Sequence, residues 1–91
     1  MADHASPLPH SGQQLADTAR AAGWLVGGEW GRQSLSNDIW HLLRIVHPTN
    51  SLQKMQVTYL AGRLSSVLLF RPYRGWVDGT LKAALTYLKD S

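Results

Sequence analysis

The stretch Leu35–His47, LSNDIWHLLRIVH, decides which fold the sequence predicts. Four of its apolar residues fall at helical spacing and form one broad face: Ile39, Leu42, Leu43 and Val46. Trp40 and Ile45 project elsewhere, so the segment is apolar around most of a helix. The pattern therefore predicts a buried helix that ends at His47, because a residue before proline is disfavoured in helical geometry.

Size and composition describe a single small globular domain. The chain has 91 residues, of which 44% are hydrophobic and 16% are charged. A domain of this size buries about 60% of the surface that its unfolded chain exposes, so its stability is modest and association would add to it. Cysteine is absent, which excludes disulfides and thiolate chemistry.

Targeting signals are not expected. The first residues lack the cations and the apolar core of a signal peptide. The most hydrophobic uncharged run, Leu64–Phe70 between two arginines, is far shorter than the roughly 18 residues of a membrane span. We expect a cytoplasmic protein that does not enter a membrane.

Residues 1–10 contain two prolines and no apolar period, which predicts a flexible N-terminal arm before a single helical domain over 11–91. Ser11 and Gln14 have capping-box spacing, and Gly23 is placed to stop the helix that follows. Trp24–Arg32 has three glycines and is expected to form a loop, with a short strand over 24–26 as an alternative.

Residues 52–70 allow two interpretations. Val57, Leu60, Leu64 and Val67 follow a helical stripe. The alternative is a hairpin at about 55–70 that turns at Ala61-Gly62, because apolar and polar residues alternate before that pair. The helix is the main prediction, since four positions match its spacing.

A last helix is expected after Asp78, which would cap it. One face of this helix would be apolar: Val77, Leu81, Ala84, Leu85 and Leu88. The predicted fold class is therefore all-α, a small bundle of about four helices. The alternative is an α+β fold that contains the hairpin.

No enzymatic signature is present. Glu29 is the only glutamate, and Asp38 and Asp78 are interpreted as helix caps, so neither catalytic residues nor a cofactor is expected. His41 and His47 would lie 120° apart on a helix and could not share a metal ion. Ala2-Asp3-His4 would form a square-planar nitrogen set for Cu(II) or Ni(II) if Met1 were removed, but no physiological metal site is predicted.

The segment Arg71–Trp76 interleaves cations and aromatic rings. Arg71, Tyr73, Arg74 and Trp76 are candidate contacts for an anion or a nucleic acid, while the same segment also suits a plain turn. Residues 47–91 carry six cations and two acidic residues, whereas residues 1–46 carry three cations and four acidic residues. A helix-turn-helix formed by 35–47 and the helix from Ser51 is a further possibility for nucleic-acid binding.

Taken together, these features favour a non-enzymatic protein–protein interaction module. The expected role is a small regulatory adaptor, inhibitor or anti-activator that binds a larger regulatory protein by helix packing and forms a homodimer. The candidate partner-binding residues are Leu35, Ile39, Trp40, Leu43, Arg44 and His47. The alternative function is a small basic nucleic-acid-binding protein.

Overall fold

The computed structural model describes residues 8–89 as a five-stranded antiparallel sheet with two short helices. The elements are α1 (His10–Ala21), β1 (Leu25–Arg32), β2 (Ile39–Val46), β3 (Lys54–Leu60), β4 (Arg63–Arg71), β5 (Gly75–Asp78) and α2 (Leu81–Lys89). The strands follow one another in the order β1-β2-β3-β4-β5, so the sheet is a simple meander. The all-α prediction is therefore wrong.

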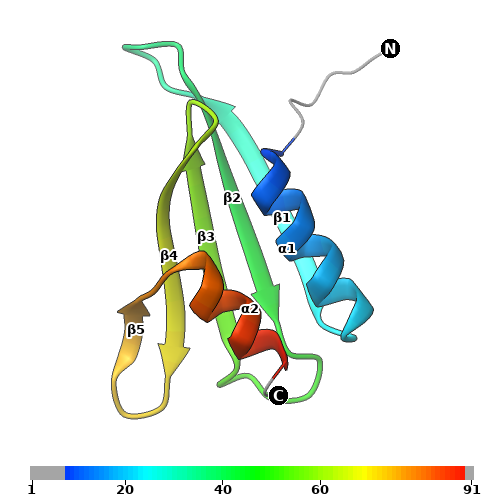
Figure 1. The fold of residues 1–91 in the computed structure, drawn as a ribbon. Coiled ribbons are helices and arrows are strands. Elements are labelled where there is room, and N and C mark those ends of the chain that lie inside the picture. The colour runs from blue at the N-terminus through cyan, green and yellow to red at the C-terminus, as the bar shows by residue number, and fades with distance from the viewer. Residues whose placement is uncertain (1–7, 90–91) are drawn as a thin grey trace.

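Both helices cover the same face of the sheet (Figure 1). A single core lies between the helices and the sheet, and it joins side chains from α1 and α2 to alternate residues of β2, β3 and β4. Its most deeply buried large members are Leu15, Ile45, Met55, Val57, Tyr59 and Leu88. The sheet therefore has one covered face and one face, called the open face below, that no described element covers.

The predicted helix over 35–47 is instead a loop followed by β2. Leu35 is fully exposed in the loop, and Asn37 has a positive φ of 61°. In β2 the side chains of His41, Leu43 and Ile45 are buried under the helices. On the opposite face of the strand, Trp40, Leu42 and Val46 are also apolar and only Arg44 is polar. The strand therefore lacks the alternation that marks most antiparallel strands and resembles a buried helix in sequence.

The predicted helix over 52–70 is wrong as well, and the structure contains a hairpin there. Leu60 pairs with Arg63, and Ala61 and Gly62 form the two-residue turn with φ of 53° and 80°. Positive φ at both turn residues matches the twist of the flanking strands. With strands on both sides of residues 48–50, the helix-turn-helix interpretation is excluded.

The two predicted terminal helices exist with different caps. Ser11 does not cap α1, because the helix begins one residue earlier at His10. The Ser11 hydroxyl instead hydrogen-bonds the Tyr59 hydroxyl at 2.8 Å. Gly23 has the expected left-handed conformation, with φ of 88°. Asp78 belongs to β5, and the α2 cap is Thr80, whose Oγ1 accepts a hydrogen bond from the Ala83 N–H at 3.1 Å.

Residues 1–7 and 90–91 lie outside the described part, so the Ala2-Asp3-His4 set and most of the predicted arm are outside it too. No helix in the described range is long and apolar enough to cross a membrane.

Candidate interaction surface

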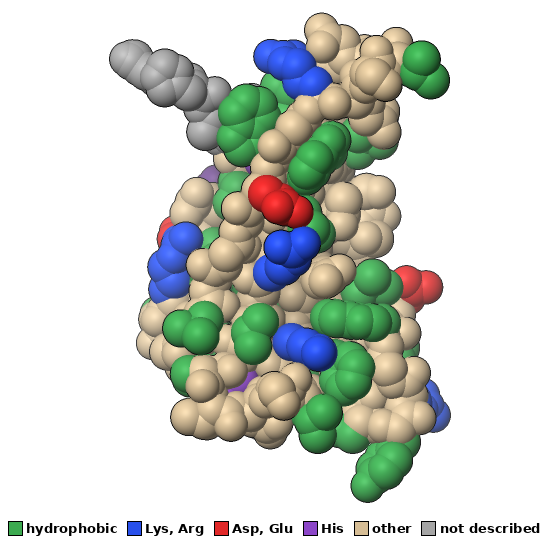
Figure 2. Space-filling view, turned by 180° about the vertical axis from the view of Figure 1, so that it is seen from behind, with side chains coloured by type: hydrophobic (Ala, Val, Ile, Leu, Met, Phe, Trp, Pro, Cys, Tyr) green, Lys and Arg blue, Asp and Glu red, His purple; other side chains and the backbone are tan. Residues whose placement is uncertain are grey.

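The open face of the sheet carries an unusual number of apolar side chains. Because paired residues share a face and neighbours along a strand alternate, the strand register identifies its members. Its apolar members are Leu25, Trp40, Leu42, Val46, Leu60, Leu68, Phe70 and Trp76. Figure 2 views the molecule from this side and shows hydrophobic side chains across the sheet, with charged side chains between them.

One end of the open face is an aromatic row with a cation above it. Phe70 and Trp76 face each other across β4 and β5, with ring centroids 5.5 Å apart in an edge-to-face arrangement. The Lys54 Nζ lies 4.6 Å from the centre of the Phe70 ring and 5.6 Å from that of Trp76. This row presents flat apolar surface and positive charge together.

The other end of the open face is formed by Trp40. Gly31 lies opposite Trp40 in the register, and a Cβ at Gly31 would come within 2.8 Å of the indole. The missing side chain of Gly31 therefore lets the indole lie across β1. Trp40 is partly buried by this contact but still contributes to the open face.

The middle of the open face is more polar. The Arg44 guanidinium donates a hydrogen bond to the Glu29 carboxylate at 3.2 Å, and both side chains are 52% exposed. An exposed ion pair of this kind contributes little stability. It does neutralise two charges that a partner covering the face would otherwise have to accommodate.

The structure divides the predicted partner-binding residues among three places. Trp40 and Arg44 lie on the open face, as residues four apart on a strand do. Ile39, Leu43 and His47 point to the covered side, where His47 packs edge-on against Trp24 with centroids 5.1 Å apart. Leu35 lies in the exposed loop before β2. The six residues do not form one surface.

The predicted anion-contact residues are likewise split between the two faces. Trp76 is on the open face, and Tyr73 and Arg74 lie exposed in the turn between β4 and β5. Arg71 is turned the other way, with its guanidinium carbon 5.1 Å from the centre of the Tyr87 ring in α2. Lys54 and Phe70 complete the cluster, and sequence spacing did not associate them with it.

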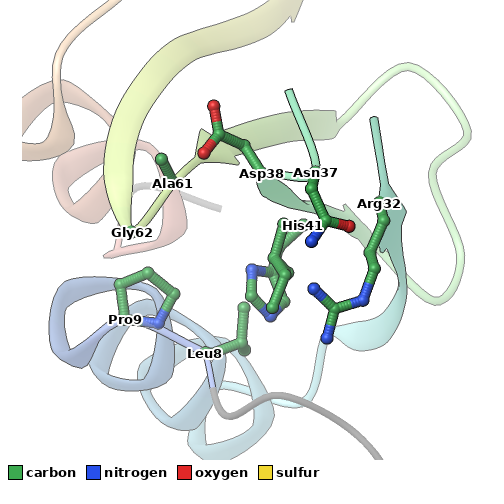
Figure 3. Close-up of a pocket in the computed structure, with 9 residues that line it drawn as sticks. Leu8, Pro9, Arg32, Asn37, Asp38, His41, Ala61 and Gly62 are labelled. Carbon is green, nitrogen blue, oxygen red and sulfur yellow. The ribbon is translucent and has the colours of Figure 1, made fainter. Parts of the chain in front are cut away.

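A pocket of about 600 Å³ lies on the covered side, beyond the start of α1. Its walls include Leu8, Pro9, Ile39 and Ala61 together with four polar residues. Figure 3 shows Arg32, Asn37 and His41 directed toward one another, while the Asp38 carboxylate points away from them. These donors suit an anionic group chemically, although Asp38 in the same wall opposes one.

Within residues 8–89, no group of three or more His, Asp or Glu side chains is placed to hold a metal ion. No protein-family model matches the chain, and no curated protein and no solved structure matches it either.

Proposed function

We propose that this protein is a non-enzymatic interaction module that binds a larger regulatory protein through the open face of its sheet. The observation that carries the proposal is the set of eight apolar side chains on a face that no described element covers. In an antiparallel sheet with one solvated face, that face is normally polar. Apolar side chains gathered in this number on an uncovered face favour an interaction site.

The size of the face supports this role. Five strands about 4.8 Å apart and about seven residues long cover roughly 24 by 23 Å, or about 550 Å². A partner that covered this area would bury about 1,100 Å² in total, which is above the roughly 1,000 Å² minimum for a biological interface. Helix packing, the mode expected from the sequence, is replaced here by packing on a sheet.

A pull-down with matched variants tests the proposal. Leu42 and Leu68 flank β3 near the middle of the open face, so Leu42→Lys with Leu68→Lys puts two charges at its centre. Leu35→Lys with Leu52→Lys adds the same two charges in exposed loops and serves as the control. We expect a protein from the native extract that binds the wild type and the loop variant but not the face variant. A bound protein that the folded face variant retains would contradict the proposal.

A second candidate function is the binding of single-stranded nucleic acid. The observation that favours it is the aromatic row, where Phe70 and Trp76 offer stacking surfaces beside the Lys54 ammonium. Tyr73 and Arg74 extend this group into the adjacent turn. Bases stack on such rings and phosphates bind such cations.

Fluorescence anisotropy with a labelled oligonucleotide at two salt concentrations tests this second function. Binding should weaken steeply with salt and should fall on Trp76→Ala and on Arg74→Ala. Arg20→Ala is the control, because Arg20 is an exposed cation on α1 that pairs with Asp17, away from the row. An equal loss of affinity in Arg74→Ala and Arg20→Ala, with no loss in Trp76→Ala, would indicate non-specific charge attraction and would count against the site.

A further inference from the structure

The two edges of the sheet differ strongly. β5 has only four residues, a length that limits pairing with another chain. β1 has eight residues, contains neither Pro nor Lys, and is mostly exposed. No element of the described chain lies beyond it in the sheet (Figure 1). β1 carries two charged residues, Glu29 and Arg32, but has none of the proline, lysine or short length that often blocks edge pairing. It therefore presents a long row of backbone donors and acceptors.

The hydrogen bonding beside β1 shows which of its backbone groups are available. The Gln33 N–H donates to the Asp38 carbonyl at 2.9 Å, just beyond the last pair of β1 and β2, Arg32 with Ile39. Along an antiparallel pair, the N–H and C=O groups of successive residues point alternately toward and away from the neighbouring strand. The backbone groups of the odd-numbered residues of β1 therefore point to β2. Val26, Gly28, Trp30 and Arg32 consequently direct their N–H and C=O groups to the open edge.

We propose that a second copy of this chain pairs with β1 in antiparallel fashion, with Gly28 opposite Gly28 at the two-fold axis. In this register Val26 of each copy faces Trp30 of the other, and all three central pairs use the outward-directed backbone groups. Each such pair exchanges two hydrogen bonds, which gives six across the dimer. The two sheets become one continuous sheet of ten strands.

The side chains of β1 fit this register. Trp30 is 39% exposed and would be covered by Val26, an aromatic and β-branched cross-strand pair. Leu25, 61% exposed, would lie opposite Gly31 and so beside the Trp40 indole. A shift by two residues would instead place Glu29 opposite Glu29, a like-charge pair that disfavours that alternative. The strand is self-complementary in the first register, which is why a second copy is the occupant.

This dimer leaves the open face uncovered on both copies, so it is independent of the function proposed above. The dimer would double the number of strands in the open face that a partner could contact. Loss of the dimer and loss of partner binding through Leu42 and Leu68 are separate outcomes of separate variants.

A charge-swap experiment tests the register directly. Gly28→Asp places two carboxylates opposite each other in the homodimer, and Gly28→Lys places two ammonium groups there. A Cβ at Gly28 would lie 3.4 Å from the Leu42 carbonyl oxygen, and a hollow of about 140 Å³ lined by Gly28 and Leu8 leaves room for the new side chain. The mixture of the two variants brings opposite charges together.

We expect sedimentation equilibrium to show a wild-type dimer, weakened self-association of each variant, and association in the mixture about tenfold tighter than in either variant alone. A wild-type protein that stays monomeric at high concentration would overturn the proposal. The proposal would also be overturned if both variants still formed the dimer. It would be overturned as well if the variants were folded but mixing them did not restore dimer formation.

Hydrogen exchange in the wild-type protein gives a second test that needs no variant. The amides of Val26, Gly28 and Trp30 should exchange more slowly in concentrated than in dilute protein, because only the dimer gives them carbonyl partners. The Gly27 and Glu29 amides, which face β2, should change much less. Equal exchange of the three outward amides at both concentrations would contradict pairing through β1.

Discussion

Gly31 illustrates how one absent side chain shapes the surface of this protein. A Cβ there would lie 2.8 Å from the Trp40 indole, so Gly31→Ala must push the indole off β1. We expect a loss of about 1–3 kcal/mol in the free energy of unfolding, as for other overpacked sites. Urea denaturation followed by far-ultraviolet circular dichroism measures this.

Gly27→Ala is the matched control for that prediction. Gly27 lies on the same strand and the same face, and nothing approaches its Cβ position within 4 Å. Alanine is about 0.5–1 kcal/mol better than glycine inside a strand, so this variant should be as stable as the wild type or more stable. Equal destabilisation by the two substitutions would mean that the contact with Trp40 is not the cause.

Tyr59 links α1 to the centre of the sheet through its hydroxyl. The ring is 1% exposed, and the hydroxyl lies 2.8 Å from the Ser11 hydroxyl. Tyr59→Phe keeps the packing and removes this bond, so it should cost about 0.5–1.5 kcal/mol of unfolding free energy. Ser11→Ala made in the Tyr59→Phe background should add little further loss, and a large additional loss in the double-mutant cycle would refute the link.

At the scale of elements, the sequence predicted α1 and α2 but assigned β2, β3 and β4 to helices. The two helices could be predicted from the sequence because the spacing of their apolar residues fits a helix and does not fit a strand. In 52–70 the helical stripe combined residues that the hairpin separates, since Val57 and Val67 are buried and Leu60 lies on the open face. Apolar residues on both faces of β2 removed the alternation that would have identified it as a strand.

The candidate surface was predictable only in part, for the same reason. Trp40 and Arg44 were recognised because aromatic residues and arginine are common in interfaces, and their spacing of four suits one face in either kind of element. Phe70 and Lys54 were not recognised as part of the surface, because only the pairing of β3 with β4 brings them together. The sequence did indicate that the chain has more apolar residues than its core buries. In the structure, these additional apolar residues lie on the open face of the sheet.

The start of α2 depends on the hydroxyl of Thr80, which accepts the Ala83 N–H. Thr80→Ala leaves that donor without its cap and should cost about 1 kcal/mol, with faster hydrogen exchange in α2. Thr86→Ala is the control, because Thr86 is exposed within α2 and alanine favours the helix there. If Thr86→Ala destabilised the protein as much as Thr80→Ala, the cap would not be the cause.

On the scale of the whole molecule, one core joins both helices to strands β1 to β4. Trp24 follows α1, is 3% exposed, and contacts His47 after β2 and Tyr87 in α2. Tyr87 in turn donates a hydrogen bond to the Phe70 carbonyl of β4 at 2.8 Å. Helices and sheet thus share contacts that cannot be lost one element at a time without exposing the common core.

This connectivity predicts a single cooperative unfolding transition in dilute protein. Tryptophan fluorescence reports mainly on local packing, whereas far-ultraviolet circular dichroism reports on the sheet and helices, so the two curves in urea should coincide. The spectrum before the transition should be that of a β-rich protein. A fluorescence change that precedes the loss of secondary structure would show that packing around the tryptophans is lost before the sheet and helices unfold. The shared core would then not be the unit of stability.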